Sequence, residues 1–407
     1  MRDLLFLSHR IPYPPEKGEK IRAWHVFERL ARSHRMHLGC FIDDPPDQAH
    51  LPYLRSRCAD LACFPLDRRR QKLTALARLR PGQPLSISYF RDARLQRWTD
   101  EKLAAGIDRV FVYCSAMAPY VMDAAGLHRV LDMVDIDSEK WAEYATRSAW
   151  PARFVWAREA RTLLAFERRA AQEFEHTVFV SQAECRRFET LAPEARGRVG
   201  WVDNGVDLAR FSPAHGFASP FPAGGPDLVF TGTMDYWPNA DAVAWFAREV
   251  LPRLRRDRPG LRFWIVGANP APEVERLARL PGVLVTGRVA DPRPYLAHAA
   301  AAVVPLRIAR GIQNKVLEAM AMARPVVASP QAFEGVRAMP GRDLLVAEGA
   351  ADTARGVEDV LQGRHPDLGA AARTAMERGH DWAVTLAPLD SLIAADTPVP
   401  VAAEHAA

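Results

Sequence analysis

The fold is decided by the stretch RGIQNKVLEAMA, residues 310–321, and by the RPVV that follows at residues 324–327. An apolar run at Ala301–Pro305 precedes it, Gly311 supplies a turn, and a helical pattern begins near Lys315. The segment therefore predicts a strand, a glycine turn and a helix start. Repetition of such a unit is typical of a parallel α/β sheet.

The same alternation of short apolar runs and helical stretches extends in both directions, in two series. The first series has strands expected at Leu4–Ser8, His37–Ile42, Arg109–Cys114, Arg129–Met133 and Thr177–Ser181, with helices at Ile21–Ser33 and Ala152–Phe174. The second has strands expected at Leu228–Gly232, Arg262–Val266, Val283–Thr286, Ala301–Pro305 and Pro325–Ala328, with helices at Ala240–Arg256, Glu273–Leu280 and Lys315–Met322. Two doubly wound parallel sheets are expected.

The domain boundary is expected near residue 204, where WVDNGVD (201–207) precedes a Pro/Gly-rich stretch at 219–226. The N-terminal domain would span 1–204, joined by a C-terminal helix near 381–395, and the second domain 205–380. Residues 397–407 lack periodicity and predict a frayed tail. Ligands of open α/β sheets bind beyond the carboxyl ends of the strands, so two facing sheets predict an interdomain cleft.

Composition places the chain among folded globular proteins. Of its 407 residues 48% are hydrophobic and 25% charged, and the formal net charge is +5. The basic residues are mostly scattered arginines without a nucleic-acid-binding motif, so no nucleic acid partner is expected. Five cysteines without a C-x-x-C pair encode neither a disulfide framework nor a zinc knuckle, and favour a cytoplasmic location.

No signal peptide or spanning segment is expected, because the apolar runs are far too short. One basic cluster, residues 67–80, interleaves Arg68, Arg69, Arg70, Lys72, Arg78 and Arg80 with leucines at near-helical spacing. It predicts either peripheral attachment to an anionic membrane surface or a solvated helix whose apolar stripe packs on the domain.

A helix starting near Asn314 would direct the amides of Asn314, Lys315, Val316 and Leu317 toward a bound diphosphate. Lys315 adds a positive charge, and Glu318 lies one turn further on, where it can accept hydrogen bonds from ribose hydroxyls. The alternative interpretation of the same residues is an ordinary amphipathic helix with an exposed Glu-Lys pair.

Several segments resemble the retaining GT-B glycosyltransferases of family four. They are residues 310–321, NGVD at 204–207, and FTGTM at 230–234 with Pro238-Asn239. The opening SHRIPYPP (8–15) and KGEKIR (17–22), with DMVDIDS (132–138), resemble the sugar transferases associated with PEP-CTERM/exosortase exopolysaccharide clusters. This resemblance implies an α/β GT-B fold of two facing Rossmann-like domains.

The resemblance also implies donor-binding residues. In such enzymes two glutamates separated by seven residues hold the donor sugar and the ribose; the second matches Glu318, and the first position holds Arg310. The family's Arg and Lys after the first strand of the second domain are absent, so Arg307 or Arg310 is expected to supply the cation. The alternative interpretation is that both are ordinary surface arginines in an arginine-rich protein. The donor-binding set is Gly18, Gly232, Thr233, Arg307, Gly311, Asn314, Lys315, Val316, Leu317 and Glu318.

The catalytic residues expected are Asp135, Asp137 and Arg310. Many relatives carry a histidine after the fourth strand, but here the sequence reads YCSAM at 113–117, so no histidine is carried over. Asp135 and Asp137 would orient the acceptor or stabilise positive charge on the sugar. An Asp-x-Asp pattern is also a reason to consider a Mg²⁺ or Mn²⁺ site, whereas helix capping by Asp137 or Ser138 is the simpler interpretation. No metal and no cofactor are expected.

The function expected is transfer of a sugar from a nucleotide diphosphate sugar to a growing, lipid-linked glycan in exopolysaccharide synthesis, with retention of configuration. Such a hexosyl-type enzyme would act in the cytoplasm, peripherally on the inner membrane face. Two alternatives stay open: a catalytically lapsed scaffold of a polysaccharide assembly complex, and a nucleotide-sugar epimerase.

Overall fold

The chain is described by a computed structural model over residues 1–16, 18–67, 71, 82–309 and 311–395. It forms two compact units. The N-terminal unit comprises Met1–Asp203 and the C-terminal segment that begins at Leu386, and the C-terminal unit comprises Asn204–Thr385. Of the helices in these ranges, none is both long and apolar enough to cross a membrane.

The N-terminal unit is built on a seven-stranded sheet in the order β3-β2-β1-β4-β5-β6-β7. Its strands are β1 (Arg2–Ser8), β2 (His34–Ile42), β3 (Asp60–Pro65), β4 (Arg109–Tyr113), β5 (His128–Val134), β6 (His176–Phe179) and β7 (Val199–Trp201). All of the pairings are parallel, and β1 lies between β2 and β4, with Leu5 opposite both His37 and Val110. The central strands are buried on both faces, as a parallel sheet covered by helices requires.

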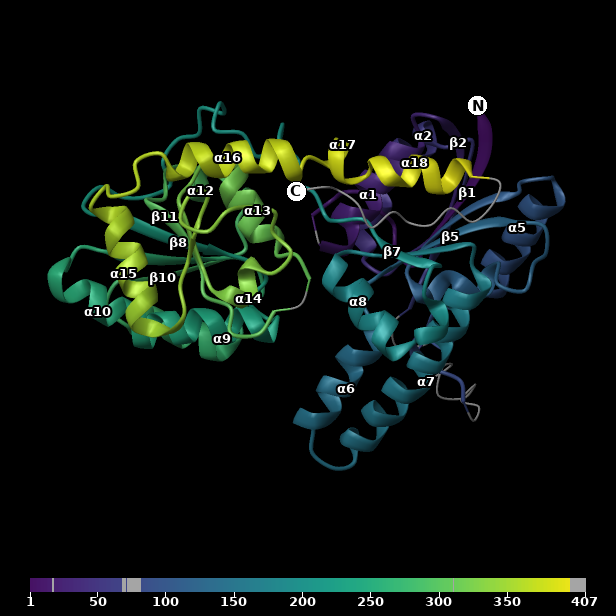
Figure 1. Cartoon of the computed structure of the whole chain (residues 1–407), viewed down its shortest axis with the longest axis horizontal. Helices are drawn as coiled ribbons and strands as arrows, with labels where there is room; N and C mark the ends of the chain where they lie inside the picture. The colour runs from purple at the N-terminus through teal and green to yellow at the C-terminus, as the bar shows by residue number, and fades with distance from the viewer. Residues whose placement is uncertain (17, 68–70, 72–81, 310, 396–407) are drawn as a thin grey trace. The chain divides into compact units, whose positions relative to one another are not determined.

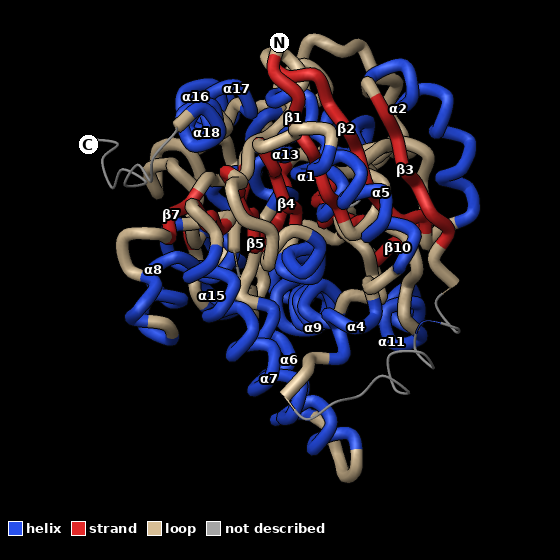
Figure 2. The backbone as a smooth tube through the Cα atoms, turned by 90° about the vertical axis from the view of Figure 1, so that its right-hand side faces the viewer, coloured by secondary structure: helices blue, strands red, loops and turns tan. Residues whose placement is uncertain are grey.

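Helices lie on both faces of this sheet (Figure 1). They are α1 (Gly18–Leu30), α2 (Leu51–Arg57), α4 (Leu85–Tyr89), α5 (Ala93–Ala104), α6 (Asp137–Arg147), α7 (Ala152–Glu173) and α8 (Gln182–Leu191), with short 3-10 segments at Pro45–His50, Ser115–Tyr120 and Pro193–Ala195. Gly39 in β2 allows α5 to pack closely, because a Cβ there would lie 2.8 Å from the ring of Trp98. Helices α6 and α7 form an antiparallel pair that extends away from the sheet, as both Figure 1 and Figure 2 show.

The last helix of the chain, α18 (Ala387–Ala394), packs against β5 of the N-terminal unit. Arg109 at the start of β4 donates to the carbonyls of Ile393 and Ala395 at 2.9 and 2.8 Å. Arg29 of α1 pairs with Asp390, the Nε–Oδ1 distance being 3.0 Å. The chain therefore enters the N-terminal unit twice.

The C-terminal unit has a six-stranded parallel sheet in the order β10-β9-β8-β11-β12-β13. Its strands are β8 (Asp227–Thr231), β9 (Arg262–Val266), β10 (Val283–Gly287), β11 (Ala301–Val304), β12 (Val326–Ala328) and β13 (Leu345–Val346). Its helices are α9 (Trp237–Trp245), α10 (Leu251–Asp257), α11 (Pro272–Glu275), α12 (Arg293–His298), α13 (Asn314–Ala321), α14 (Pro330–Phe333), α15 (Gly349–Leu361), α16 (Leu368–Gly379) and α17 (Trp382–Thr385), with a π turn at Phe246–Val250 and a 3-10 turn at Arg276–Arg279. These helices also cover both faces of the sheet (Figure 1).

The α/β fold with two Rossmann-like sheets is confirmed. Three strands, β3, β7 and β13, were not expected from the sequence, and all three lie at sheet edges. The helix expected at Ala240–Arg256 begins earlier, at Trp237, and contains the π turn. Likewise α1 begins at Gly18 rather than at Ile21, so Gly18 is the first residue of the helix and not part of the preceding loop.

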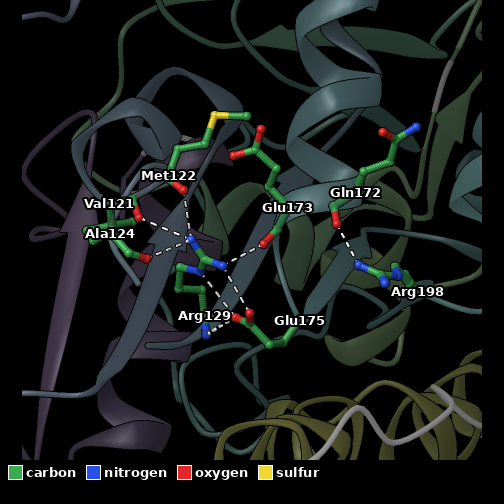
Figure 3. Close-up of polar contacts among 8 residues, drawn as sticks. All are labelled: Val121, Met122, Ala124, Arg129, Gln172, Glu173, Glu175 and Arg198. Atoms are coloured by element: carbon green, nitrogen blue, oxygen red, sulfur yellow. Dashed lines mark hydrogen bonds and ion pairs between the residues drawn. The ribbon is translucent and has the colours of Figure 1, made fainter. Parts of the chain in front are cut away.

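Many arginines of this chain bond internally, as Arg129 in β5 illustrates (Figure 3). Its guanidinium pairs with the Glu175 carboxylate, Nη2 lying 3.0 Å from Oε1. It also donates to the backbone carbonyls of Val121, Met122, Ala124 and Glu173. Arg198 donates in the same way to the carbonyl of Gln172. The arginines counted in the net charge are thus partly structural.

Candidate functional site

The carboxyl edge of the C-terminal sheet carries the first group of expected donor residues. Gly232 directly follows β8, and its amide donates to the carbonyl of Val266 at 3.0 Å. A Cβ on Gly232 would lie 2.7 Å from Nδ2 of Asn239 and 3.4 Å from Cε of Lys315. Asn239 Nδ2 also donates to the carbonyl of Thr233 at 2.9 Å. A larger residue at this position would therefore displace the Asn239 side chain that contacts Lys315.

Lys315 lies over this turn from the start of α13. Its Nζ donates to Oδ1 of Asn239 at 3.0 Å and lies 5.4 Å from the ring centre of Phe230. Burial lowers the pKa of Lys315 to about 8, against the opposing effect of Glu318. With this pKa the ammonium is still mostly charged at neutral pH, and a bound anion would favour the charged form further.

The N-terminus of α13 differs from the expectation in one respect. The amides of Val316 and Leu317 both donate to the carbonyl of Gln313, at 2.9 and 3.4 Å. The prediction that these two amides point to a diphosphate was wrong, because the carbonyl of the cap residue Gln313 already accepts from both. Within the described ranges, the amides of Asn314 and Lys315 are left for an anion.

Glu318 follows Lys315 by three residues and hence lies on the same side of α13. Its half-buried carboxylate makes no hydrogen bond or ion pair with the described residues. Burial raises the pKa of Glu318 to about 7, and Lys315 and Arg210 act in the opposite direction. A half-buried carboxylate without a partner in the described structure can still accept hydrogen bonds from a ligand.

Arg307, Arg310 and Gly311 are the remaining donor residues expected in the connection before α13. Arg307 pairs with Asp241 of α9, Nε lying 2.9 Å from Oδ2, and its side chain is about half exposed. Gly311 has φ +64°, a conformation that favours glycine. Arg310 lies outside the described residues.

In the N-terminal unit, Gly18 begins α1 with open space where a Cβ would be. The protein's own packing therefore does not require this glycine. Next to it, Glu19 accepts from Nη1 of Arg10 at 2.7 Å, and Arg10 Nε lies 3.1 Å from Asp43.

Asp135 and Asp137 lie where α6 begins after β5. Asp137 is the first residue of that helix, with Ile136 as the cap residue and no capping bond from its side chain. The amide and hydroxyl of Ser138 donate to the carboxylate of Glu167 at 3.1 and 2.5 Å. The amide of Ile136 donates to Glu184 at 3.1 Å.

The prediction that Asp137 or Ser138 caps α6 was therefore wrong. Carboxylates from two other helices, Glu167 of α7 and Glu184 of α8, satisfy the amides instead. Burial raises the pKa of Glu167 to about 8. Among the described residues no group of three or more His, Cys, Asp or Glu side chains is placed to hold a metal ion.

Two residues of these edges were missed as site candidates. Asn239 orients Lys315, and the signal for it was the Pro-Asn pair at the start of α9. His9, after β1, stacks on Tyr113 at the end of β4 with ring centres 6.0 Å apart, and its Nδ1 is buried without a partner in the described structure. Burial, with Arg10 acting in the same direction, lowers the pKa of His9 to about 4.

Comparison with known proteins agrees with this geometry. Residues 225–363, which contain Gly232, Asn239, Lys315 and Glu318, match the family model of the glycosyl transferases group 1. No curated protein matches the chain by sequence.

Solved structures match over nearly the whole chain. Sucrose-phosphate synthase from Thermosynechococcus elongatus has a TM-score of 0.67 at 17% identity, covering 96% of this chain and 98% of its own. HepE of Anabaena, solved in complex with UDP and glucose, has a TM-score of 0.64 at 15% identity, covering 96% and 99%. WaaG, a glycosyltransferase involved in lipopolysaccharide biosynthesis, has a TM-score of 0.63 at 14% identity, with the same coverage. The chain thus has the fold of the GT-B glycosyltransferases, and its residues 225–363 match the glycosyl transferases group 1 family.

Proposed function

We propose that this protein is a glycosyltransferase that takes a nucleotide diphosphate sugar as donor. The observation that carries the proposal is that Lys315 and Glu318 lie on the same side of the first turns of α13, with Lys315 beside the glycine turn after β8. Lys315 supplies charge for a diphosphate, and Glu318 offers an unused carboxylate to ribose hydroxyls. Both residues lie within the segment that matches the transferase family.

In this mechanism the chain stabilises the departing diphosphate. The Lys315 ammonium and the amides of Asn314 and Lys315 neutralise negative charge as the bond between sugar and phosphate breaks, which lowers the barrier to an oxocarbenium-like transition state. Arg310 is proposed as a second cation for the diphosphate. We further propose a hexosyl donor, retention of configuration, and a lipid-linked glycan acceptor in exopolysaccharide synthesis at the cytoplasmic face of the membrane. These finer proposals rest on the resemblance described above.

The first test is a panel of nucleotide sugars and nucleoside diphosphates scored by thermal stabilisation. A ligand that binds only the folded state raises the melting temperature by mass action. UDP and UDP-glucose come first in the panel, because HepE was solved with UDP and glucose. Absence of stabilisation by every nucleotide would contradict the proposal.

Transfer itself is then assayed with membrane extract and the stabilising donor. An epimerase would convert the nucleotide sugar without any acceptor, so product formation that ignores the extract favours that alternative.

The lapsed-scaffold alternative is favoured by Arg310 in place of the family's glutamate and by the absence of the family's histidine after the fourth strand. If Arg310 binds the diphosphate, Arg310→Ala lowers the transfer rate by several-fold to hundreds-fold, at tenfold for each 1.36 kcal/mol. A gain of activity confined to Arg310→Glu would show instead that the natural chain has lost its sugar clamp.

A further inference from the structure

The loop that joins α6 to α7 and the helix ends on either side of it carry an unusual concentration of exposed apolar side chains. The described residues leave ten large hydrophobic side chains exposed, and four of them lie between positions 144 and 155. They are Tyr144 (41% exposed), Trp150 (79%), Phe154 (64%) and Val155 (43%). Every residue from Ala149 to Val155 is exposed. We call residues 144–158 the hairpin tip.

Side-chain contacts hold α6 and α7 together on the sheet side of the hairpin tip. Trp141 of α6 stacks on Trp156 of α7 with ring centres 4.9 Å apart and planes at 14°, and Tyr144 packs edge-on against Trp141 at 5.6 Å. At the other end of the pair, Glu167 of α7 binds Ser138 of α6. The two helices extend away from the sheet of their own unit, and the loop between them forms the far end (Figures 1 and 2).

The charge of the hairpin tip has one sign. No Asp or Glu occurs between Glu143 and Glu159, whereas Arg147, Arg153 and Arg158 lie in that interval. Arg153 is exposed, and Arg158 donates to the carbonyl of Gln83 at 3.1 Å. An exposed tryptophan and phenylalanine beside the exposed Arg153, with no carboxylate nearby in the sequence, match the chemistry of an anionic lipid interface, where aromatic rings lie at headgroup level and cations face lipid phosphates.

We propose that the hairpin tip inserts its aromatic side chains into the interface of an anionic membrane. A lipid surface is favoured over a protein because seven consecutive exposed residues are few against the roughly 800 Å² per partner of a stable protein interface. The attachment is peripheral, since none of the described helices can cross a membrane. It differs from attachment through residues 68–80, of which all but Gln71 lie outside the described residues.

Vesicle flotation of the full chain, without any nucleotide sugar, tests this proposal and leaves the transferase proposal untouched. Wild type should float with vesicles that contain phosphatidylglycerol, float far less with phosphatidylcholine alone, and lose binding as salt is raised. Trp150→Ala with Phe154→Ala should lower the partition coefficient by about tenfold or more. Arg153→Gln should lower it by about fivefold at low salt.

The matched control is Tyr236→Ala with Trp237→Ala, which removes two exposed aromatic rings of the C-terminal unit and should leave flotation unchanged. Because Trp150 and Phe154 are exposed, their removal should leave the melting temperature near that of wild type. Three results would overturn the proposal: no flotation of wild type, equal flotation of the aromatic double variant, or loss of flotation only when Arg68, Arg69 and Arg70 are changed to Gln. A dimer seen by light scattering and abolished by the double variant, without flotation, would assign the tip to a second copy of the chain.

Discussion

Two helices of this protein begin directly beyond the carboxyl end of a sheet, α6 in the N-terminal unit and α13 in the C-terminal unit, and they use their first turns differently. At α6 the amides of Ile136 and Ser138 are already bound by the carboxylates of Glu184 and Glu167. At α13 no internal carboxylate binds the first turn in the described structure, and Lys315 adds positive charge.

The difference teaches that a helix start binds an external anion only when the protein's own side chains have not already accepted hydrogen bonds from its amides. Both helix starts have the same backbone chemistry and the same dipole. The carboxyl groups of Glu167 and Glu184 already accept hydrogen bonds from these amides of α6 and leave them unavailable to a diphosphate, whereas α13 remains able to bind one. The following predictions test this contrast.

Replacing the lysine of α13 should have the largest effect. Lys315→Met removes the charge that faces the diphosphate, so we expect the transfer rate to fall by about 10²–10³-fold, as for loss of one preorganised stabilising group. The matched control is Lys140→Met, in the first turns of α6, which should change the rate little. Equal losses in the two variants would show that α13 has no special role.

The carboxylate of α13 should matter next. Glu318→Ala removes charge-assisted hydrogen bonds to ribose hydroxyls, so nucleoside diphosphate affinity should weaken by about 1.5–3 kcal/mol in titration calorimetry. Glu318→Gln, which keeps one acceptor, should lose less. Unchanged affinity in a folded Glu318→Ala variant would remove this residue from the site.

The buried carboxylate at α6 should appear in stability rather than in binding. The pKa of Glu167 is raised from 4.5 to about 8, so its contribution is fully present below pH 4.5 and is lost as pH rises through 8. Each pH unit within this window costs about 1.4 kcal/mol. Glu167→Gln keeps partners for Ser138 without titrating.

Thermal unfolding between pH 6 and about 8.5 checks this effect, because the raised pKa of Glu167 places the loss there. The melting temperature of Glu167→Gln should rise relative to wild type as pH increases. Glu101→Gln, on an exposed position of α5, serves as the control and should follow wild type. Parallel curves for all three proteins would show that Glu167 is ionised in the folded state.

Metal removal should have no effect. We expect EDTA to leave turnover unchanged, because Lys315 and the start of α13 neutralise the diphosphate. Activity that is abolished by EDTA and restored by Mn²⁺ would assign the catalytic role to Asp135 and Asp137, and would reverse the contrast between the two helices.

The central strands were predictable because they are continuous apolar runs. β9, expected at Arg262–Val266, has those bounds in the structure, and β1 and β4 differ by two residues or fewer. The edge strands β7 and β13 were missed because they have only three and two residues, and β3 because most of its residues are partly exposed, so it lacks the continuous burial of a central parallel strand. Helix starts were less predictable, since α1 and α9 each begin three residues early.

The sequence by itself determined the two-sheet α/β architecture and the identity of Lys315 and Glu318 as candidate ligands, because apolar periodicity and glycine turns are local properties. Only the tertiary structure decided which polar groups are already satisfied. Glu167 lies 29 residues from Ser138 and Asn239 lies 76 residues from Lys315, and no local pattern encodes either pairing. Whether a helix start can take an external anion is therefore settled by which distant side chains the fold brings to it.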